Sequence, residues 1–224
     1  MANVLKRAAF GLIEKTMSEG TVLATWWLTA EVVALDVHLP SVDMQEWKNI
    51  RRLKCKVADF AFRDYTPASW DASSRTCTLF ISVAHEGAGS RWARTIRSGD
   101  PLLFAAAYAA PLPAAGRVLG IGDATAIGHF LSLRQLQQHG PGALDVAILL
   151  SGKSVPAVSY SSMHPELHWL EGQAALDNWL DEKSPDNYSA IYIAGNIPQV
   201  TALRKRFKAM EGLAAKIYVQ GFWQ

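Results

Sequence analysis

The stretch "RVLGIGDATAIGHFLSLRQLQQHGPGALDVAILLSG", residues 117–152, contains two apolar runs separated by a segment with a helical pattern. The runs at residues 117–123 and 144–152 are continuous rather than alternating, which is typical of strands buried on both faces. Between them, residues 124–140 predict a helix that ends at Gly140. Strand, helix and strand in this order predict a parallel sheet with a right-handed crossover.

The rest of the second half continues this pattern. Residues 171–183 and 197–210 have the apolar spacing of helices, whereas residues 188–196 and 215–223 are short apolar runs rich in β-branched and aromatic side chains. The second half of the chain therefore predicts a compact α/β domain built on a parallel sheet.

The first half, from residue 21 to about residue 84, is rich in Val, Thr, Trp and Leu, which favour strands. Within it, residues 51–66 carry apolar side chains at Val57, Phe60 and Phe62 with charged residues between them. This alternation predicts one half-buried antiparallel strand. We expect this half to form a small antiparallel β-barrel or sandwich.

A short helix and a change of composition separate the two halves. Residues 88–100 predict a helix with Ser90 near its start. Residues 106–117 then contain two prolines and several small residues. We place the domain boundary in this segment, so the predicted domains are residues 1–112 and residues 113–224.

Composition and charge exclude several classes of function. Half of the 224 residues are hydrophobic and the formal net charge is +2, so we expect a folded chain with no field that would attract nucleic acid. Cys55 and Cys77 form no disulfide framework or zinc motif, which favours a reducing compartment. Residues 1–17 predict a short amphipathic helix rather than a signal peptide, and no run reaches the roughly 18 to 20 apolar residues of a membrane span. We expect a cytoplasmic protein without a membrane or nucleic-acid partner.

Two glycine-containing turns are candidate sites for a phosphate-bearing ligand. Residues 120–128, "GIGDATAIG", follow a strand and open a helix, where backbone amides favour an anion. In residues 85–93, "HEGAGSRWA", Gly87 and Gly89 precede a helix that also carries Ser90. The alternatives remain open at both places, because a tight strand-to-helix turn and an ordinary N-cap also explain these residues.

A third candidate is "FRDYTPASWD", residues 62–71. Arg63 and Tyr65 are two apart on a strand and share a face, whereas Thr66 projects the other way unless Pro67 ends the strand. A planar heteroaromatic with a phosphate tail could stack on the tyrosine and pair with the arginine. An exposed cross-strand pair is the alternative.

Other polar residues have weaker claims to a site. The pair His164 and His168 has the spacing of one helix face, but Pro165 favours a helix start, and we expect no metal. The cations of residues 203–208, "LRKRFK", favour a solvated helix face, with the adenosine phosphate of NADPH or an acidic protein as alternative partners.

The order of five motifs along the chain resembles the ferredoxin reductase superfamily. These motifs are "RDYT", the glycine and serine turn, "GDATAIG", "IYIAGN" and the terminal "GFW". Within it, the chain is most similar to the siderophore-interacting proteins, which are flavin-dependent ferric-siderophore reductases. The resemblance implies a two-domain ferredoxin-reductase-like fold: an N-terminal antiparallel β-barrel that binds FAD, followed by a C-terminal α/β NAD(P)-binding-like domain with a parallel sheet.

The resemblance also implies roles for individual residues. Arg63 would bind the flavin phosphate, Tyr65 would stack on the isoalloxazine, and Thr66 would bond near the reactive N5 edge, so that Tyr65 and Thr66 are the catalytic candidates. The further cofactor-binding candidates are His85, Gly87, Ala88, Gly89, Ser90, Trp92 and Trp223. The nicotinamide-binding candidates are Gly122, Asp123, Thr125, Ala126, Ala194 and Gly195.

The function implied is electron transfer from NADH or NADPH through FAD to a ferric siderophore or another iron chelate. The cofactor would supply the redox chemistry, and the protein would hold and orient it. A basic mouth formed by Lys54, Lys56 or Arg91 would suit an anionic chelate. The alternatives are a reductase of the same fold that acts on free flavin, a quinone or a ferredoxin-type partner, and a non-catalytic flavin-binding or assembly module.

Overall fold

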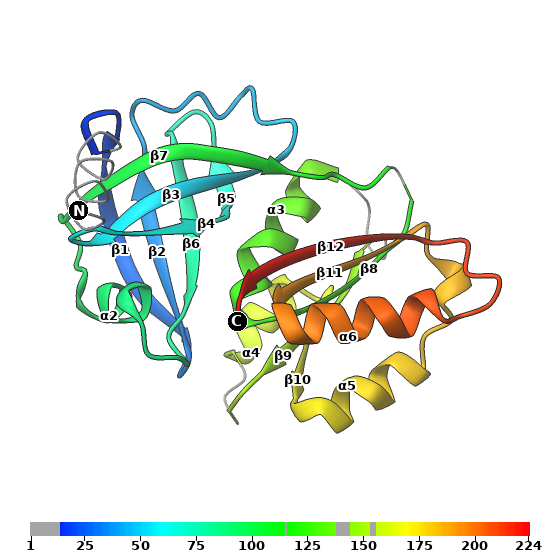
Figure 1. Ribbon diagram of the computed structural model, residues 1–224. Coiled ribbons are helices and arrows are strands. Elements are labelled where there is room, and N and C mark those ends of the chain that lie inside the picture. The colour runs from blue at the N-terminus through cyan, green and yellow to red at the C-terminus, as the bar shows by residue number, and fades with distance from the viewer. Residues whose placement is uncertain (1–13, 115, 138–143, 153–155) are drawn as a thin grey trace, which may run out of the picture.

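The computed structural model describes residues 14–114, 116–137, 144–152 and 156–224, whose strands form two sheets placed side by side (Figure 1). Most of the helix predicted at the start of the chain, and the predicted helix end at Gly140, lie outside the described residues. No helix among the described residues is long and apolar enough to cross a membrane.

The first sheet is antiparallel and follows the strand order β4-β3-β7-β1-β2-β6-β5. Its strands are β1 (Ser18–Thr29), β2 (Val32–His38), β3 (Ile50–Ala58), β4 (Ala61–Tyr65), β5 (Pro67–Asp71), β6 (Thr76–Ser82) and β7 (Pro101–Ala110). The strands β4 and β5 stand at opposite ends of this order, yet only Thr66 separates them in the chain. The sheet therefore curls into an open barrel whose two edges are joined through Thr66.

The prediction of one strand over residues 51–66 was wrong. The chain turns at Asp59 and Phe60, so that β3 and β4 form a hairpin in which Ala58 faces Ala61. Phe60 has a φ of 57° and its side chain is 46% exposed. Because a phenylalanine occupies a turn position usually held by glycine or asparagine, the alternating pattern continues through the turn without a break.

The predicted helix after β6 is present as α2 (Ala88–Thr95) but is shorter than expected. It begins after Gly87 and ends at Thr95, because the backbone of the next residue, Ile96, is extended. Ser90 lies inside the first turn rather than at the cap, and its hydroxyl donates to the carbonyl of Ser82 at 3.4 Å.

The second sheet is parallel and has the order β10-β9-β8-β11-β12. Its strands are β8 (Val118–Asp123), β9 (Leu144–Leu150), β10 (Leu167–Glu171), β11 (Ala190–Asn196) and β12 (Lys216–Trp223). The helical segments are η1 (Ala124–Ala126), α3 (Ile127–Gln137), α4 (Val158–Met163), α5 (Gly172–Asp181), η2 (Pro185–Asn187) and α6 (Ile197–Lys208). The prediction missed β10 and α4. Since His168 lies on β10 and His164 follows α4, the two histidines share no helix face.

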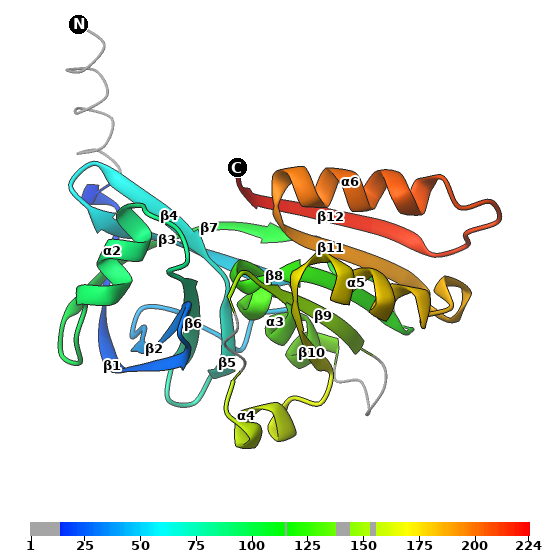
Figure 2. The same ribbon diagram turned by 90° about the horizontal axis from the view of Figure 1, so that it is seen from below.

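The helices of the second domain cover both faces of its sheet (Figures 1 and 2). On one face, α5 and α6 bury Trp179 and Phe207 against the sheet. On the other face, α3 lies between the second sheet and the first, where Phe130 joins a core that includes Phe80 of β6. The two domains therefore share a hydrophobic core, which fixes the cleft between them.

Polar contacts strengthen the joint between the domains. The Gln135 side chain of α3 accepts from the backbone amide of Trp70 at 3.1 Å and donates to its carbonyl at 2.7 Å. A Cβ on Gly128 would lie 2.6 Å from the carbonyl oxygen of Thr66, so α3 needs glycine at this approach. We propose to keep the domain division between residues 112 and 113, because β7 ends at Ala110 and β8 begins at Val118.

Candidate functional site

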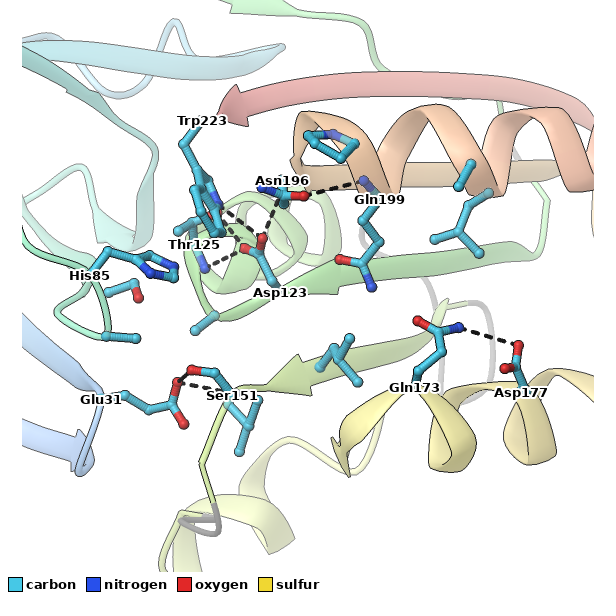
Figure 3. Close-up of a pocket in the computed structure, with 18 of the residues that line it drawn as sticks. Glu31, His85, Asp123, Thr125, Ser151, Gln173, Asp177, Asn196, Gln199 and Trp223 are labelled. Atoms are coloured by element: carbon cyan, nitrogen blue, oxygen red, sulfur yellow. Dashed lines mark hydrogen bonds between the residues drawn. The ribbon is translucent and has the colours of Figure 1, made fainter.

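Two adjoining cavities open between the domains. The first, which we call the inner cavity, has a volume of about 480 Å³ and includes Arg52, Tyr65, Thr66, Gly89, Gly128 and Phe222 in its lining. The second, the outer cleft, has a volume of about 680 Å³ and includes Glu31, Asp123, Ser151, Asn196 and Gln199 (Figure 3). Arg206 also belongs to its lining. Both are lined by Ser82, His85, Thr125 and Trp223.

The junction of β4 and β5 brings the predicted Arg-Tyr-Thr motif to the inner cavity. The Tyr65 ring stacks on the ring of Trp92 from α2, with centroids 5.9 Å apart and an angle of 18°. Burial raises the pKa of the Tyr65 phenol, which therefore stays neutral. Arg63 is exposed and its Nη1 donates to the carbonyl of Phe62 at 2.7 Å.

The N-terminus of α2 forms a second wall of this cavity. Gly87 is the N-cap residue, no side chain caps this end, and no acidic residue occupies the first turn. Backbone amides at such an end are available to an anion. A Cβ on Gly89 would lie 2.6 Å from the hydroxyl oxygen of Tyr65, whereas nothing lies within 4 Å of a Cβ on Gly87. Ala88 and Trp92 do not line the cavity, and Trp92 supports the tyrosine ring instead.

His85 and Trp223 form the partition between the inner cavity and the outer cleft. Their ring centroids are 3.9 Å apart. The indole Nε1 of Trp223 donates to Oδ2 of Asp123 at 3.0 Å, which ties the C-terminal strand β12 to the end of β8 (Figure 3). Two ligands, one in each cavity, would therefore come closest to each other at the rings of His85 and Trp223.

Asp123 organises the end of the second sheet. Besides the indole, its carboxylate accepts from the backbone amides of Thr125 and Asn196, both at 2.8 Å, and from the Thr125 hydroxyl. The Asn196 side chain in turn accepts from the amide of Gln199 at 3.2 Å and so caps α6. These bonds hold the carboxyl ends of β8 and β11, where ligands bind in open α/β sheets.

Four predicted nicotinamide-binding residues lie behind the outer cleft and do not line it. These residues are Gly122, Ala126, Ala194 and Gly195. A Cβ on Gly122 would lie 2.6 Å from the Cβ of Ala126 and 2.7 Å from the carbonyl oxygen of Ala194. Gly195 has a φ of 128°, and a Cβ there would meet Oδ2 of Asp123 at 2.6 Å. Their small size allows the strand ends to pack closely around Asp123.

Glu31 is a residue of the outer cleft that the sequence did not single out. It lies between β1 and β2, is only 7% exposed, and reaches across the domain joint. Its carboxylate accepts from the Ser151 hydroxyl at 2.5 Å and from the backbone amides of Ser151 and Gly152 at 3.2 and 2.6 Å. No local motif marks this role, because the partner is 120 residues away in the chain.

The basic residues are distributed differently from the prediction. Lys54 pairs with Asp64 at 2.7 Å and Lys56 pairs with Glu14 at 3.0 Å. Neither lysine lines the inner cavity or the outer cleft, and neither does Arg91, so these three residues form no part of the two linings. Of the cations in residues 203–208, Arg206 faces the outer cleft and bonds to Asp177 at 2.6 Å.

Arg52 is a buried cation that the sequence analysis missed. The strand alternation around it is interrupted, since the pairing of β3 with β7 shifts between Arg51 and Leu53. This bulge turns Arg52 inward, where it is 5% exposed. Its neighbour His129 on α3 is fully buried, and burial, reinforced by the Arg52 charge, lowers the pKa of this histidine to about 3. Arg52 thus brings a buried, permanent positive charge to the lining of the inner cavity.

Comparison with known proteins supports the architecture. Residues 29–110 match the family model of the siderophore-interacting FAD-binding domain. Among curated protein sequences, none matches the chain.

Three solved structures illustrate the likeness in fold. A siderophore-interacting protein from Acinetobacter baumannii is 17% identical, with a TM-score of 0.72 over 92% of this chain and 90% of its own. The siderophore-interacting protein of Aeromonas hydrophila is 15% identical, with a TM-score of 0.70 over 92% and 91%. Phthalate dioxygenase reductase is 15% identical, with a TM-score of 0.72 over 93% of this chain and 69% of its own.

These findings confirm the resemblance seen in the sequence. The first domain matches the siderophore-interacting FAD-binding domain, and the whole chain has the two-domain fold of ferredoxin-reductase-like proteins.

Proposed function

We propose that this chain is an FAD-dependent oxidoreductase that passes electrons from NADH or NADPH to a ferric siderophore or another iron chelate. The observation that carries the proposal is the inner cavity itself. There Tyr65 and Thr66, the uncapped N-terminus of α2 and the wall shared with the outer cleft meet in one place. Each of these parts suits a different portion of a flavin nucleotide.

The residues present fit FAD. A cavity of about 480 Å³ lies within the roughly 300 to 1,000 Å³ that is usual for cofactor sites. The first turn of α2 offers backbone amides and, at Gly89, a close approach to Tyr65 that a Cβ would fill. The diphosphate would be held by these amides with Arg63, and the flavin ring by Tyr65 and Thr66. When bound, FAD supplies the capacity to accept a hydride and to release single electrons.

The side chains around Tyr65 hold it as a stacking platform. Trp92 supports its ring, and the raised pKa keeps the phenol neutral, so the platform adds no negative charge beside the flavin ring. Thr66 lies where the two edges of the barrel meet, and α3 presses against its carbonyl at Gly128. Contacts from both domains therefore fix the position of Thr66. A residue that donates a hydrogen bond to the reacting edge of a ring needs such a fixed position.

The outer cleft is the place proposed for the nicotinamide nucleotide. It lies at the carboxyl ends of the parallel strands, close to the ends of β8 and β11. Trp223 stands in the partition, and its bond to Asp123 keeps it there. Access of a nicotinamide to the inner cavity would require the Trp223 ring to move.

The match of residues 29–110 to the siderophore-interacting FAD-binding domain favours an iron chelate as the acceptor. A protein acceptor or a ferredoxin-type electron donor is the second candidate. It is favoured because none of the lysines that the structure describes lines either cavity, and because the similar phthalate dioxygenase reductase transfers electrons from pyridine nucleotides to a [2Fe-2S] centre. We place the reaction in the cytoplasm, a reducing compartment that suits the free thiols of Cys55 and Cys77.

The test begins with protein loaded with FAD under anaerobic conditions. Addition of NADH or NADPH should bleach the flavin absorption, and addition of a ferric siderophore should restore it with release of ferrous iron. No bleaching with either nucleotide would remove the nicotinamide assignment. Restoration by a [2Fe-2S] ferredoxin but by no ferric chelate would favour the second candidate.

A variant of Arg63 tests the phosphate contact separately. Arg63→Ala should weaken FAD binding by about 1.5 to 3 kcal/mol, which is the usual range for a hydrogen bond to a charged group. The matched control is Arg204→Ala, because Arg204 is exposed on α6 and lines neither cavity. Equal affinities of the two variants would refute this role of Arg63.

A further inference from the structure

The inner cavity contains a buried arginine whose hydrogen-bonding capacity is mostly unused. Arg52 on β3 is 5% exposed and lines the cavity together with Tyr65 and Thr66. Its Nη1 donates to the hydroxyl of Tyr108 at 2.6 Å. Among the residues that the structure describes, its Nε and Nη2 have no hydrogen-bond partner.

Aromatic rings hold the guanidinium in place. Its central carbon lies 4.4 Å from the centroid of the Phe222 ring and 4.9 Å from that of the Tyr108 ring. Contacts of this kind stabilise a cation but leave its N–H groups without acceptors. The guanidinium is therefore fixed in orientation, while two of its buried nitrogens have no acceptor among the described residues.

No carboxylate in the described part of the chain forms an ion pair with Arg52. The nearby Asp64 pairs with Lys54 at 2.7 Å, and the neighbouring His129 is neutral because burial lowers its pKa. Arginine stays protonated in proteins, so the charge persists. A buried charge without a partner is costly, and such groups are normally satisfied by an ion pair, a metal or a ligand.

We propose that Arg52 is a flavin-binding residue, which donates hydrogen bonds to a nitrogen or carbonyl oxygen of the isoalloxazine ring and favours its reduced form. The inference rests on the proposed function, because it takes FAD as the occupant of the inner cavity. The pairing of β3 with β4 sets Leu53 opposite Tyr65, so Arg52 lies beside the strand end that carries Thr66. It is therefore placed beside the residues proposed to hold the ring.

The preference for the reduced form follows from charge. A hydride carries two electrons and one proton, so its transfer from a reduced nicotinamide to a neutral flavin adds one negative charge to the flavin ring. NAD⁺ or NADP⁺ is the other product. A fixed cation in a cavity of low dielectric binds the charged ring more tightly than the neutral one. Arg52 would thus raise the reduction potential of the bound cofactor.

The test compares Arg52→Met with wild type and with Arg204→Met, which removes an exposed charge that lines neither cavity. We expect Arg52→Met to weaken binding of oxidised FAD, and to weaken binding of reduced FAD by about a further tenfold. For a two-electron couple this extra tenfold corresponds to a potential lowered by about 30 mV. Arg52→Lys keeps the charge and should recover most of the potential but less of the affinity.

The stability of the FAD-free protein separates this role from a structural one. If the charge of Arg52 is satisfied only by a ligand, Arg52→Met should leave the midpoint of thermal unfolding of the FAD-free protein unchanged or raise it. The same variant should reduce the stabilisation that added FAD provides. Should Arg52→Met fail to fold, Arg52→Lys carries the test: it should bind FAD more weakly than wild type while keeping most of the wild-type potential. Failure of wild type to bind FAD would refute the proposed function. Wild-type binding with unchanged affinity and potential in both Arg52 variants would overturn the role of Arg52 alone.

Discussion

The buried histidine at the domain joint leads to a quantitative prediction about pH. His129 is fully buried on α3, where its ring meets those of Tyr192 and Phe222 with centroid distances of 4.6 and 5.9 Å. Burial and the nearby charge of Arg52 lower its pKa from 6.5 to about 3. The unfolded chain therefore binds more protons than the folded one between these two pKa values. The free energy of unfolding consequently falls as the pH drops below about 6.5.

The size of the effect follows from the pKa difference. At pH 5 the folded histidine is still neutral, whereas the unfolded one is about 1.5 pH units below its pKa, so the loss is about 2 kcal/mol. In His129→Leu this contribution is absent. The stability of wild type relative to the variant should thus decrease by about 2 kcal/mol between pH 7 and pH 5.

Urea unfolding of the FAD-free protein, followed by tryptophan fluorescence at several pH values, measures this difference. The shared core of the two domains should give one cooperative transition. The effect of leucine on packing changes the stability by an amount that does not depend on pH. His129→Phe packs differently, but the stability of wild type relative to it should decrease by the same amount between pH 7 and pH 5. A wild-type stability advantage that is constant from pH 7 to pH 5 would refute the reasoning.

Three further predictions concern the walls of the two cavities. Gly89→Ala should lower the affinity for FAD by about tenfold or more because its Cβ displaces the neighbouring phenol; Arg204→Ala, at an exposed position that lines neither cavity, is the control, and equal dissociation constants of the two variants in a flavin titration would contradict the prediction. Glu31→Gln should lower the free energy of unfolding by about 1 to 3 kcal/mol, because a buried charged acceptor is lost; an unchanged urea midpoint would count against it. Asp177→Asn should raise the affinity for NADPH relative to NADH by about fivefold, since Arg206 is partly released; a constant ratio of nucleotide dissociation constants would exclude this.

The order of the elements in the second domain could be read from the sequence because the signals are local. Continuous apolar runs predicted β8, β9, β11 and β12, and helical spacing predicted α3, α5 and α6. The edge strand β10 was missed because His168 and Trp169 interrupt its apolar pattern and Pro165 precedes it. Edge strands are buried less completely, so selection for a continuous apolar run is weaker there.

The segments that form the site were predicted better than the contacts within it. The order of motifs indicated that residues 62–71 and 85–93 meet, and the structure brings Tyr65 against Gly89. The bond between Asp123 and Trp223 joins residues 100 apart, and no spacing rule predicts such a pair. The inward position of Arg52 was not predicted for another reason. Inward residues are recognised by their alternation along a strand, and a bulge in β3 interrupts that alternation at Arg52.

The central claim is that the inner cavity holds FAD. Titration of the FAD-free protein with FAD, followed by flavin absorption and by quenching of tryptophan fluorescence, tests it directly. We predict saturation at one FAD per chain, with an affinity that falls in Gly89→Ala and not in Arg204→Ala. A protein that shows no saturable uptake of FAD, or whose uptake is the same in these two variants, would contradict the account.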